Sequence, residues 1–274
     1  MDGECQLHKD TKKKFNLGQV DFINCLPVNF PIENGDVQID AEIIRGVPAE
    51  LNKLILNNEI DIAPVSSVTY LENKGKLVSV GDLCIASNGP ADSVLLFSKY
   101  PLDELSSANI LLSSASATSN KLVQIIFREF LKIDAKFESS SLNISDFSAR
   151  LLIGDHALLE FSKKPKDTFI YDLGSLWKKY TGLPMVFGMW VVRKELEKVI
   201  STLDIISTLQ SALEAGLNLR LNEVINKAQS KILLSKEFYE SYFRHLTYKF
   251  DENCKKGLEL FEKYSKTLEL ITLR

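Results

Sequence analysis

The chain has 274 residues, of which 45% are hydrophobic and 25% charged, and its formal net charge at pH 7 is -3. This composition is typical of a globular protein that buries one large core or two small ones, and the lack of a basic excess argues against a nucleic-acid partner. Residues 1–15 hold no apolar stretch of the kind found in signal peptides, and no segment has the length of a membrane-spanning helix, so we expect a cytoplasmic protein with no membrane partner.

Short apolar runs alternate with helical patterns in the first half of the chain. This alternation is typical of an α/β fold. The expected strands are residues 17–24, 37–44, 60–65, 92–98 and 109–112, and the expected helices are residues 48–57, 68–70 after a cap at Ser66 and Ser67, and 121–131.

The second half begins with the same alternation and then becomes helical. The expected strands are residues 150–153, 168–171 and 185–192, and helices are expected to begin at residue 154 and to span residues 173–180. After Lys194 the pattern favours helices alone, over residues 201–228, 236–246 and 251–268.

The order of the elements suggests two lobes. Strands that alternate with helices favour parallel pairing through βαβ crossovers, followed here by a helical C-terminal region. We expect two strands, at residues 92–98 and 185–192, to cross between the lobes. The predicted division is lobe I at residues 1–95 and 190–274, lobe II at residues 96–189, and a ligand cleft between them.

Small polar residues follow the predicted strands, where open α/β sheets bind their ligands. They are Asn24, Ser66, Ser67, Ser87, Gly89, Ser93, Ser116, Thr118, Ser119 and Asp155. A helix N-terminus offers unpaired N–H groups, and hydroxyls add further donors, so two such helix starts are suited to holding an anion without a cation. Each residue could equally be only a cap or a turn residue. The residues alone therefore predict a cleft for a small anion and leave the reaction class open.

Other kinds of site find little support. The four cysteines and three histidines are too scattered for local zinc spacing or a redox pair, so no metal site is predicted. A glycine-rich phosphate loop is absent from the sequence. Local spacing does not indicate a Ser-His-Asp triad either.

Several short blocks of sequence occur in a characteristic order between Phe22 and Val192. They are residues 22–27 (FINCLP), 46–52 (GVPAELN), 61–67 (DIAPVSS), 87–90 (SNGP), 116–119 (SATS), 152–158 (LIGDHAL), 171–174 (YDLG) and 181–187 (TGLPMVF). As an ordered set they resemble the chorismate dehydratases of the futalosine route to menaquinone. Thr69 and Gly188 depart from that pattern, in which an acidic residue and an alanine are usual.

The resemblance implies a two-lobed fold like that of type II periplasmic binding proteins, with mixed sheets flanked by helices. It implies a lyase that dehydrates chorismate, a small dicarboxylate, to 3-[(1-carboxyvinyl)oxy]benzoate without a cofactor, as a monomer or homodimer. Asn24 is then expected to bond the leaving hydroxyl or a carboxylate. The carboxylates are expected to lie at Ser66, Ser67, Thr118 and Ser119. Either Asp155 or a substrate carboxylate takes the proton.

Two other functions fit the same architecture. One is that of a 1,4-dihydroxy-6-naphthoate synthase, an enzyme of the same pathway and fold, although the sequence blocks match the dehydratases better. The other is that of a solute-binding protein for a small carboxylate, which would bind its ligand without turnover.

Overall fold

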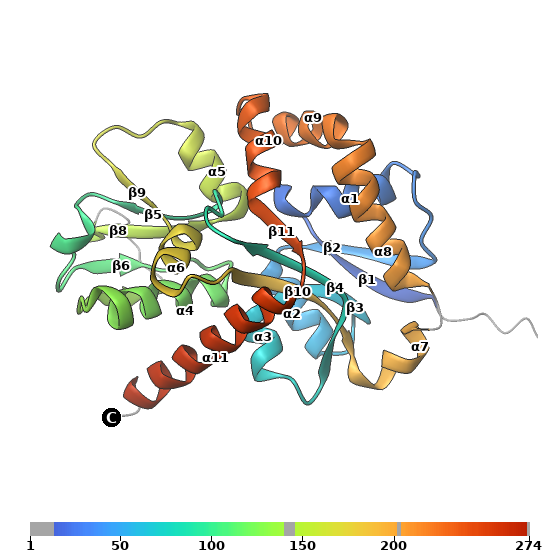
Figure 1. Cartoon of the computed structure of the whole chain (residues 1–274), viewed down its shortest axis with the longest axis horizontal. Coiled ribbons are helices and arrows are strands. Elements are labelled where there is room, and N and C mark those ends of the chain that lie inside the picture. The colour runs from blue at the N-terminus through green and yellow to red at the C-terminus, as the bar shows by residue number, and fades with distance from the viewer. Residues whose placement is uncertain (1–13, 140–145, 202–203, 273–274) are drawn as a thin grey trace, which may run out of the picture.

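Two β-sheets organise the computed structural model, which describes residues 14–139, 146–201 and 204–272. Figure 1 shows the sheets side by side, with helices around each. The first sheet has the order β11-β4-β10-β3-β1-β2 and the second has the order β7-β6-β8-β5-β9.

The first sheet is mixed. Its strands are β1 (Phe15–Val20), β2 (Ala41–Gly46), β3 (Ile62–Ser66), β4 (Leu77–Ser87), β10 (Met185–Arg193) and β11 (Leu246–Lys249). Strand β1 runs parallel to β2 and β3, whereas β10 lies antiparallel between β3 and β4. The carboxyl ends of β1 and β3 therefore meet at one edge, as the sequence predicts for a binding site.

The second sheet is also mixed and smaller. Its strands are β5 (Val94–Ser98), β6 (Asn109–Leu111), β7 (Lys136–Glu138), β8 (Ala149–Ile153) and β9 (Phe169–Asp172). Strand β6 is parallel to β7 and β8, and β5 is antiparallel to β8 and β9. The sequence favoured parallel pairing through βαβ crossovers. Strands β5 and β10 instead pair antiparallel with both of their neighbours.

Helices surround the two sheets. In chain order they are α1 (Leu26–Glu33), α2 (Pro48–Leu56), α3 (Ser67–Glu72), α4 (Ala117–Ile125), α5 (Gly154–Ser162), α6 (Leu173–Thr181), α7 (Glu197–Ser201), α8 (Ile205–Glu214), α9 (Leu221–Lys231), α10 (Lys236–His245) and α11 (Glu252–Thr272). Helix α4 continues as a π-helix over Ile126–Leu131, and α8 continues as one over Ala215–Leu219. None of the helices in the described ranges is long and apolar enough to cross a lipid bilayer.

The pairing of the strands bears on where the two proposed lobes divide. Strand β5 pairs only within the second sheet and β10 only within the first, so neither strand crosses between them. The predicted breaks after residues 95 and 189 fall inside these strands. The connections between the sheets are residues 88–93 and 182–184, and we place the proposed lobe boundaries there.

Helix α11 ties the two halves together. Figure 1 shows it running from the first sheet beneath the second, toward the C-terminus. Trp177 of α6 is fully buried and meets Phe261 and Tyr264 of α11 edge-on, with ring centroids 6.2 and 6.4 Å apart. Most buried hydrophobic residues of both sheets form one core, and Leu95 and Phe97 of β5 form a separate small cluster with Ala157 of α5.

Candidate functional site

Residues from both sheets line one cavity of about 80 Å³, within a hollow of about 660 Å³ that includes space open to solvent. Its lining is mostly apolar. The lining residues are Val20, Phe22, Asn24, Cys25, Pro48, Pro64, Val65, Ser66, Ile85, Ala91, Ser93, Val94, Ser116, Ser119, Ile153, Gly154, Phe187, Gly188 and Leu246. No Lys, Arg, His, Asp or Glu is among these described lining residues.

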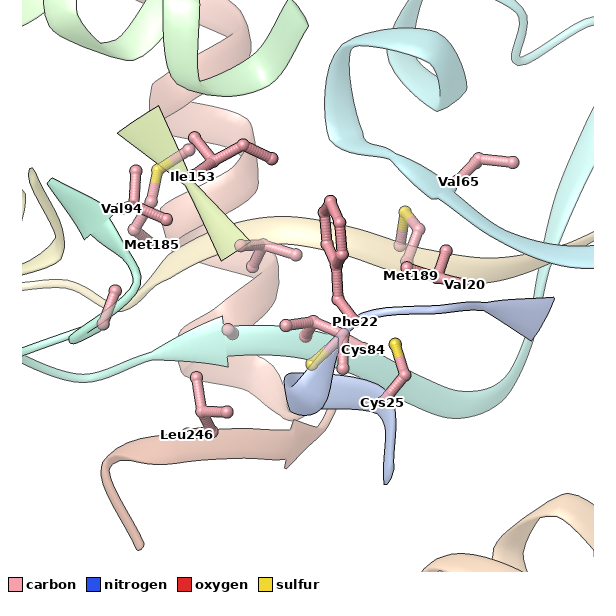
Figure 2. Close-up of a cluster of buried hydrophobic side chains, with 14 of the residues drawn as sticks. Val20, Phe22, Cys25, Val65, Cys84, Val94, Ile153, Met185, Met189 and Leu246 are labelled. Carbon is pink, nitrogen blue, oxygen red and sulfur yellow. The ribbon is translucent and has the colours of Figure 1, made fainter. Parts of the chain in front are cut away.

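Phe22 stands at the centre of the apolar wall. Figure 2 shows its ring between Ile153 on one side and Val65 on the other, so strands of the two sheets face each other across it. The ring is 6% exposed. A ligand in this cavity would therefore contact a mostly apolar wall.

Ser66 ends β3 and caps α3. Its hydroxyl accepts the Thr69 N–H at 3.2 Å and lies 2.8 Å from the Thr69 hydroxyl and 3.3 Å from the Asn52 amide nitrogen. Thr69, which departs from the family pattern, therefore helps to hold the Ser66 side chain. The predicted cap is confirmed, and Ser66 is also one of the residues that line the cavity.

Ser116 and Ser119 line the same cavity from the start of α4, which follows strand β6 of the second sheet. The Ser116 hydroxyl accepts the Ser119 N–H at 3.1 Å and donates to the Ser119 hydroxyl at 3.0 Å. Both hydroxyls sit at the N-terminus of a helix that continues to Leu131, which adds the positive end of a helix dipole. The two helix starts adjoin, because Thr118 accepts the Val68 N–H of α3 at 3.1 Å.

Asn24 enters the cavity from the turn that follows β1. Its side-chain oxygen is buried and finds no hydrogen-bond partner among the described residues, whereas its backbone carbonyl accepts the Tyr248 hydroxyl at 2.9 Å. Burial raises the pKa of Tyr248 well above its usual value, so this phenol stays protonated and donates. Asn24 therefore lines the cavity with its main chain held by Tyr248.

Cys25 is the one titratable side chain among the described lining residues. Burial, followed by the negative charge of Asp155, raises the pKa of its thiol to about 12. The thiol therefore stays protonated near neutral pH, and we assign it no nucleophilic or basic role.

Ser93 lies on the connection between the sheets. It donates to the Ala91 carbonyl at 3.2 Å and accepts the Tyr242 hydroxyl at 3.0 Å. The same connection is held by Asp172, which accepts the Ala91 and Asp92 N–H groups. Ser93 thus lines the cavity, while its hydroxyl links the connection between the sheets to α10.

The structure brings together Asn24, Ser66, Ser93, Ser116 and Ser119, and it places the other predicted site residues outside the lining. Those outside are Ser67, Ser87, Gly89, Thr118 and Asp155.

The residues outside the lining bond to the protein itself. Ser67 donates to the Val186 carbonyl at 2.6 Å, and Ser87 donates to the Gly89 carbonyl at 3.0 Å. Thr118 caps α3, and the Asp155 carboxylate accepts the Ile23 N–H at 2.8 Å. These groups stabilise the walls of the cavity, and none of them is among the residues that line it.

Sequence reasoning missed the apolar half of the lining and the contribution of the C-terminal region. The sequence pattern around Phe22, Ile85 and Phe187 is the same as that around core residues. No local signal therefore distinguishes apolar residues that line the cavity from those that fill the core. Tyr242 and Tyr248 come from α10 and β11, and the helical prediction for residues 236–246 and 251–268 left that short strand out. The alternation in Leu246–Lys249 (LTYK) was the available signal.

The described ranges contain no cluster of three or more His, Cys, Asp or Glu side chains placed to hold a metal ion. The residues with polar side chains in the described cavity lining are four serines, one asparagine and one cysteine.

The menaquinone biosynthesis family matches residues 15–267. The chain belongs to this family. It is similar to the chorismate dehydratase of Thermus thermophilus, with 30% identity over 236 residues that cover 80% of this chain and 84% of the relative. It is also similar to the chorismate dehydratase of Campylobacter jejuni, with 32% identity over 191 residues that cover 67% of this chain and 71% of the relative.

Solved structures share the fold. A protein of Archaeoglobus fulgidus superposes with a TM-score of 0.74 at 14% identity and covers 94% of this chain and 98% of its own. The periplasmic aliphatic sulphonate binding protein of Escherichia coli superposes with a TM-score of 0.62 at 13% identity, covering 94% of this chain and 92% of its own. The predicted periplasmic-binding-protein-like fold, with mixed sheets flanked by helices, is confirmed.

Proposed function

We propose that this family member is a chorismate dehydratase, which converts chorismate to 3-[(1-carboxyvinyl)oxy]benzoate and water. One observation carries the proposal: serines from two adjoining helix starts line a single, mostly apolar cavity together with Asn24. Chorismate is a compact apolar ring with two carboxylates and a hydroxyl. The names of the Thermus and Campylobacter relatives support the same substrate.

The two carboxylates would lie against the two serine-bearing helix starts. Ser66 takes one of them, on the side of the first sheet. Ser116 and Ser119 take the other, where Ser116 donates to Ser119 and leaves the Ser119 hydrogen to donate to the ligand. Hydrogen bonds to charged acceptors contribute about 1.5–3 kcal/mol each, so a few of them account for binding without a cation.

The reaction removes a proton from the ring carbon that bears the enolpyruvyl ether and hydroxide from the neighbouring carbon. The electron pair of the broken C–H bond completes the aromatic ring as the C–O bond breaks, and the two fragments leave as water. Asn24 is the one amide residue of the described cavity lining, and in this proposal its side-chain NH2 group donates a hydrogen bond to the departing hydroxyl. Positioning in a space with little water supplies much of the rate.

The proton acceptor in this proposal is a carboxylate of the substrate. The described lining contains no carboxylate or imidazole, and Cys25, with a pKa of about 12, is a thiol at neutral pH. Asp155 bonds to Ile23 outside the lining. A substrate carboxylate is therefore the base that lies closest to the ring.

Turnover of chorismate by the purified, metal-stripped protein tests the proposal. We expect loss of chorismate and growth of an equal amount of an aromatic product, followed by chromatography and ultraviolet absorbance. Asn24→Ala is expected to abolish most of this activity, and Ser230→Ala, on the exposed face of α9, serves as the matched control.

Two results would contradict the proposal. Tight binding of chorismate without any product would assign the chain to the solute-binding proteins. Neither binding nor turnover of chorismate would exclude it as the substrate of this cavity.

A further inference from the structure

An ion pair between α5 and α9 holds the main chain of residues 21–23, directly before Asn24. Asp155, in the first turn of α5, accepts the Ile23 N–H through one oxygen at 2.8 Å. Its other oxygen lies 3.1 Å from the ammonium group of Lys231, at the end of α9. Lys231 also bonds the carbonyl and the carboxylate of Asp21, at 3.1 and 3.0 Å. The main chain is thus held at two points directly before Asn24.

The contact between α5 and this segment depends on Gly154. The residue has φ +55° and lines the cavity beside Phe22. A Cβ atom there would lie 2.6 Å from a carbon of the Phe22 ring, so the ring packs on the glycine backbone itself. Any larger residue at this position would cost free energy of folding, both because φ is left-handed and because its Cβ would meet the ring. Phe22 is therefore fixed against the start of α5, next to the Asp155 anchor.

Solvent only partly screens the ion pair. The side chain of Asp155 is 18% exposed and that of Lys231 is 26% exposed. Burial opposes the charge of Lys231, but the bonds and attraction from Asp21 and Asp155 outweigh it and raise the pKa of the lysine. The lysine is therefore charged at neutral pH and keeps the Asp155 carboxylate turned toward the Ile23 N–H.

We propose that Asp155, oriented by Lys231, is a positioning residue that sets the place of Asn24 in the cavity by accepting the Ile23 N–H. This inference rests on the proposed dehydration for its rate effects. It replaces the acid–base role that the sequence suggested for Asp155. The anchor reaches the reacting atoms only through the main chain of residues 23 and 24. Displacement of a catalytic group by about 1 Å costs on the order of 10²-fold in rate.

Three variants separate positioning from proton transfer. Asp155→Asn loses the ion pair with Lys231 but retains an acceptor oxygen for the Ile23 N–H, so we expect it to keep about a third of the wild-type kcat. Asp155→Ala removes the acceptor and is expected to lower kcat about 30- to 100-fold with a small change in KM. Lys231→Met leaves the acceptor without its orienting charge and is expected to fall between the two. Lys227→Met, on the exposed side of α9, is the matched control and should behave as wild type.

A second readout does not depend on turnover. Hydrogen–deuterium exchange of the peptide covering residues 21–25 should speed up in Asp155→Ala and stay near wild type in Asp155→Asn, with melting temperatures recorded for each variant. Faster exchange in Asp155→Ala together with activity in Asp155→Asn is the expected result. Equal loss of activity in both variants, with loss of one limb of the pH–rate profile, would show proton transfer and overturn the proposal.

The two proposals also fail separately. Unchanged exchange at residues 21–25 in Asp155→Ala would overturn the positioning role whatever the enzyme turns over. Absence of chorismate turnover in the wild type would overturn the proposed function, while the exchange experiment would still decide whether Asp155 fixes the segment.

Discussion

Charged side chains are absent from the described lining of the cavity, whereas ion pairs gather on the segments that hold that lining in place. Asp155 and Lys231 form an ion pair that holds the segment before Asn24, and Asp21 pairs with the same lysine. Inside, serine hydroxyls and one amide face the ligand space. Neutral donors can bind a dianion without first breaking an internal ion pair, so the protein keeps its charges for positioning.

The largest effect is expected from removing the amide that faces the ligand. Asn24→Ala should lower kcat/KM for chorismate about 10²–10³-fold, as loss of one preorganised donor does in other enzymes. Its side-chain oxygen has no protein partner among the described residues, so the melting temperature should change little. A large fall in melting temperature with near-normal kcat/KM would show that Asn24 is a structural turn residue.

Substitution of Gly154 tests the contact between the start of α5 and the Phe22 ring. Gly154→Ala should lower the free energy of unfolding by about 1–3 kcal/mol, because the added Cβ strains a left-handed residue and meets the Phe22 ring. Chemical denaturation measures this change. Gly35→Ala is the control for the backbone effect alone, since Gly35 also has a positive φ but nothing lies within 4 Å of its Cβ position. Equal losses in the two variants would mean that the Phe22 contact contributes nothing.

Substitutions at two serines test which hydroxyl binds the ligand and which one stabilises the fold. Ser119→Ala should raise KM for chorismate about tenfold, since one hydrogen bond to a charged group is lost, with little loss of stability. Ser67→Ala should leave KM near wild type but cost about 1 kcal/mol of stability, because the buried Val186 carbonyl loses its donor. Steady-state kinetics and denaturation curves distinguish the two. The reverse pattern would exchange the roles we assign to these hydroxyls.

The smallest effect concerns the buried thiol. Because the pKa of Cys25 is raised from 9.0 to about 12 in the folded state, the unfolded chain loses this proton first as the pH rises. Its contribution to stability is complete below pH 9 and is lost between pH 9 and 12. At pH 10 the loss is about 1.4 kcal/mol, from 1.36 kcal/mol per unit of pKa.

Comparison with Cys25→Ala isolates this term from the other groups that titrate at high pH. The wild type should lose about 1.4 kcal/mol more than the variant between pH 8 and 10. Parallel stability curves for the two proteins would show that the thiol is not held protonated by burial.

The sequence revealed the helix caps beside the cavity, but not the contacts that support the cavity wall. Ser66 and Ser116 carry cap signals that sequence patterns reveal, and both caps are confirmed. The anchor at Asp155 joins residues 132 positions apart, and no local pattern predicts such a contact. Asp155 at a strand end therefore looked like a site residue although its carboxylate faces the Ile23 main chain.

Some elements escaped prediction for local reasons. Strand β4 was missed because Gly81 and Asp82 both take positive φ and interrupt its alternation at a bulge. Helix α1 was missed because it contains Pro31, which lacks the N–H that the Pro27 carbonyl would accept. Gly216 packs closely against that carbonyl, a contact between distant segments that the sequence does not reveal.

The most direct test of the neutral cavity is a crystal structure of the protein with the reaction product, 3-[(1-carboxyvinyl)oxy]benzoate. We expect its two carboxylates at Ser66 and at Ser116 and Ser119, with the Asn24 amide beside the ring and no charged side chain within hydrogen-bond distance. A product carboxylate bonded to Lys231, or an Asp155 carboxylate turned onto the ring, would contradict the division between a neutral lining and a charged support.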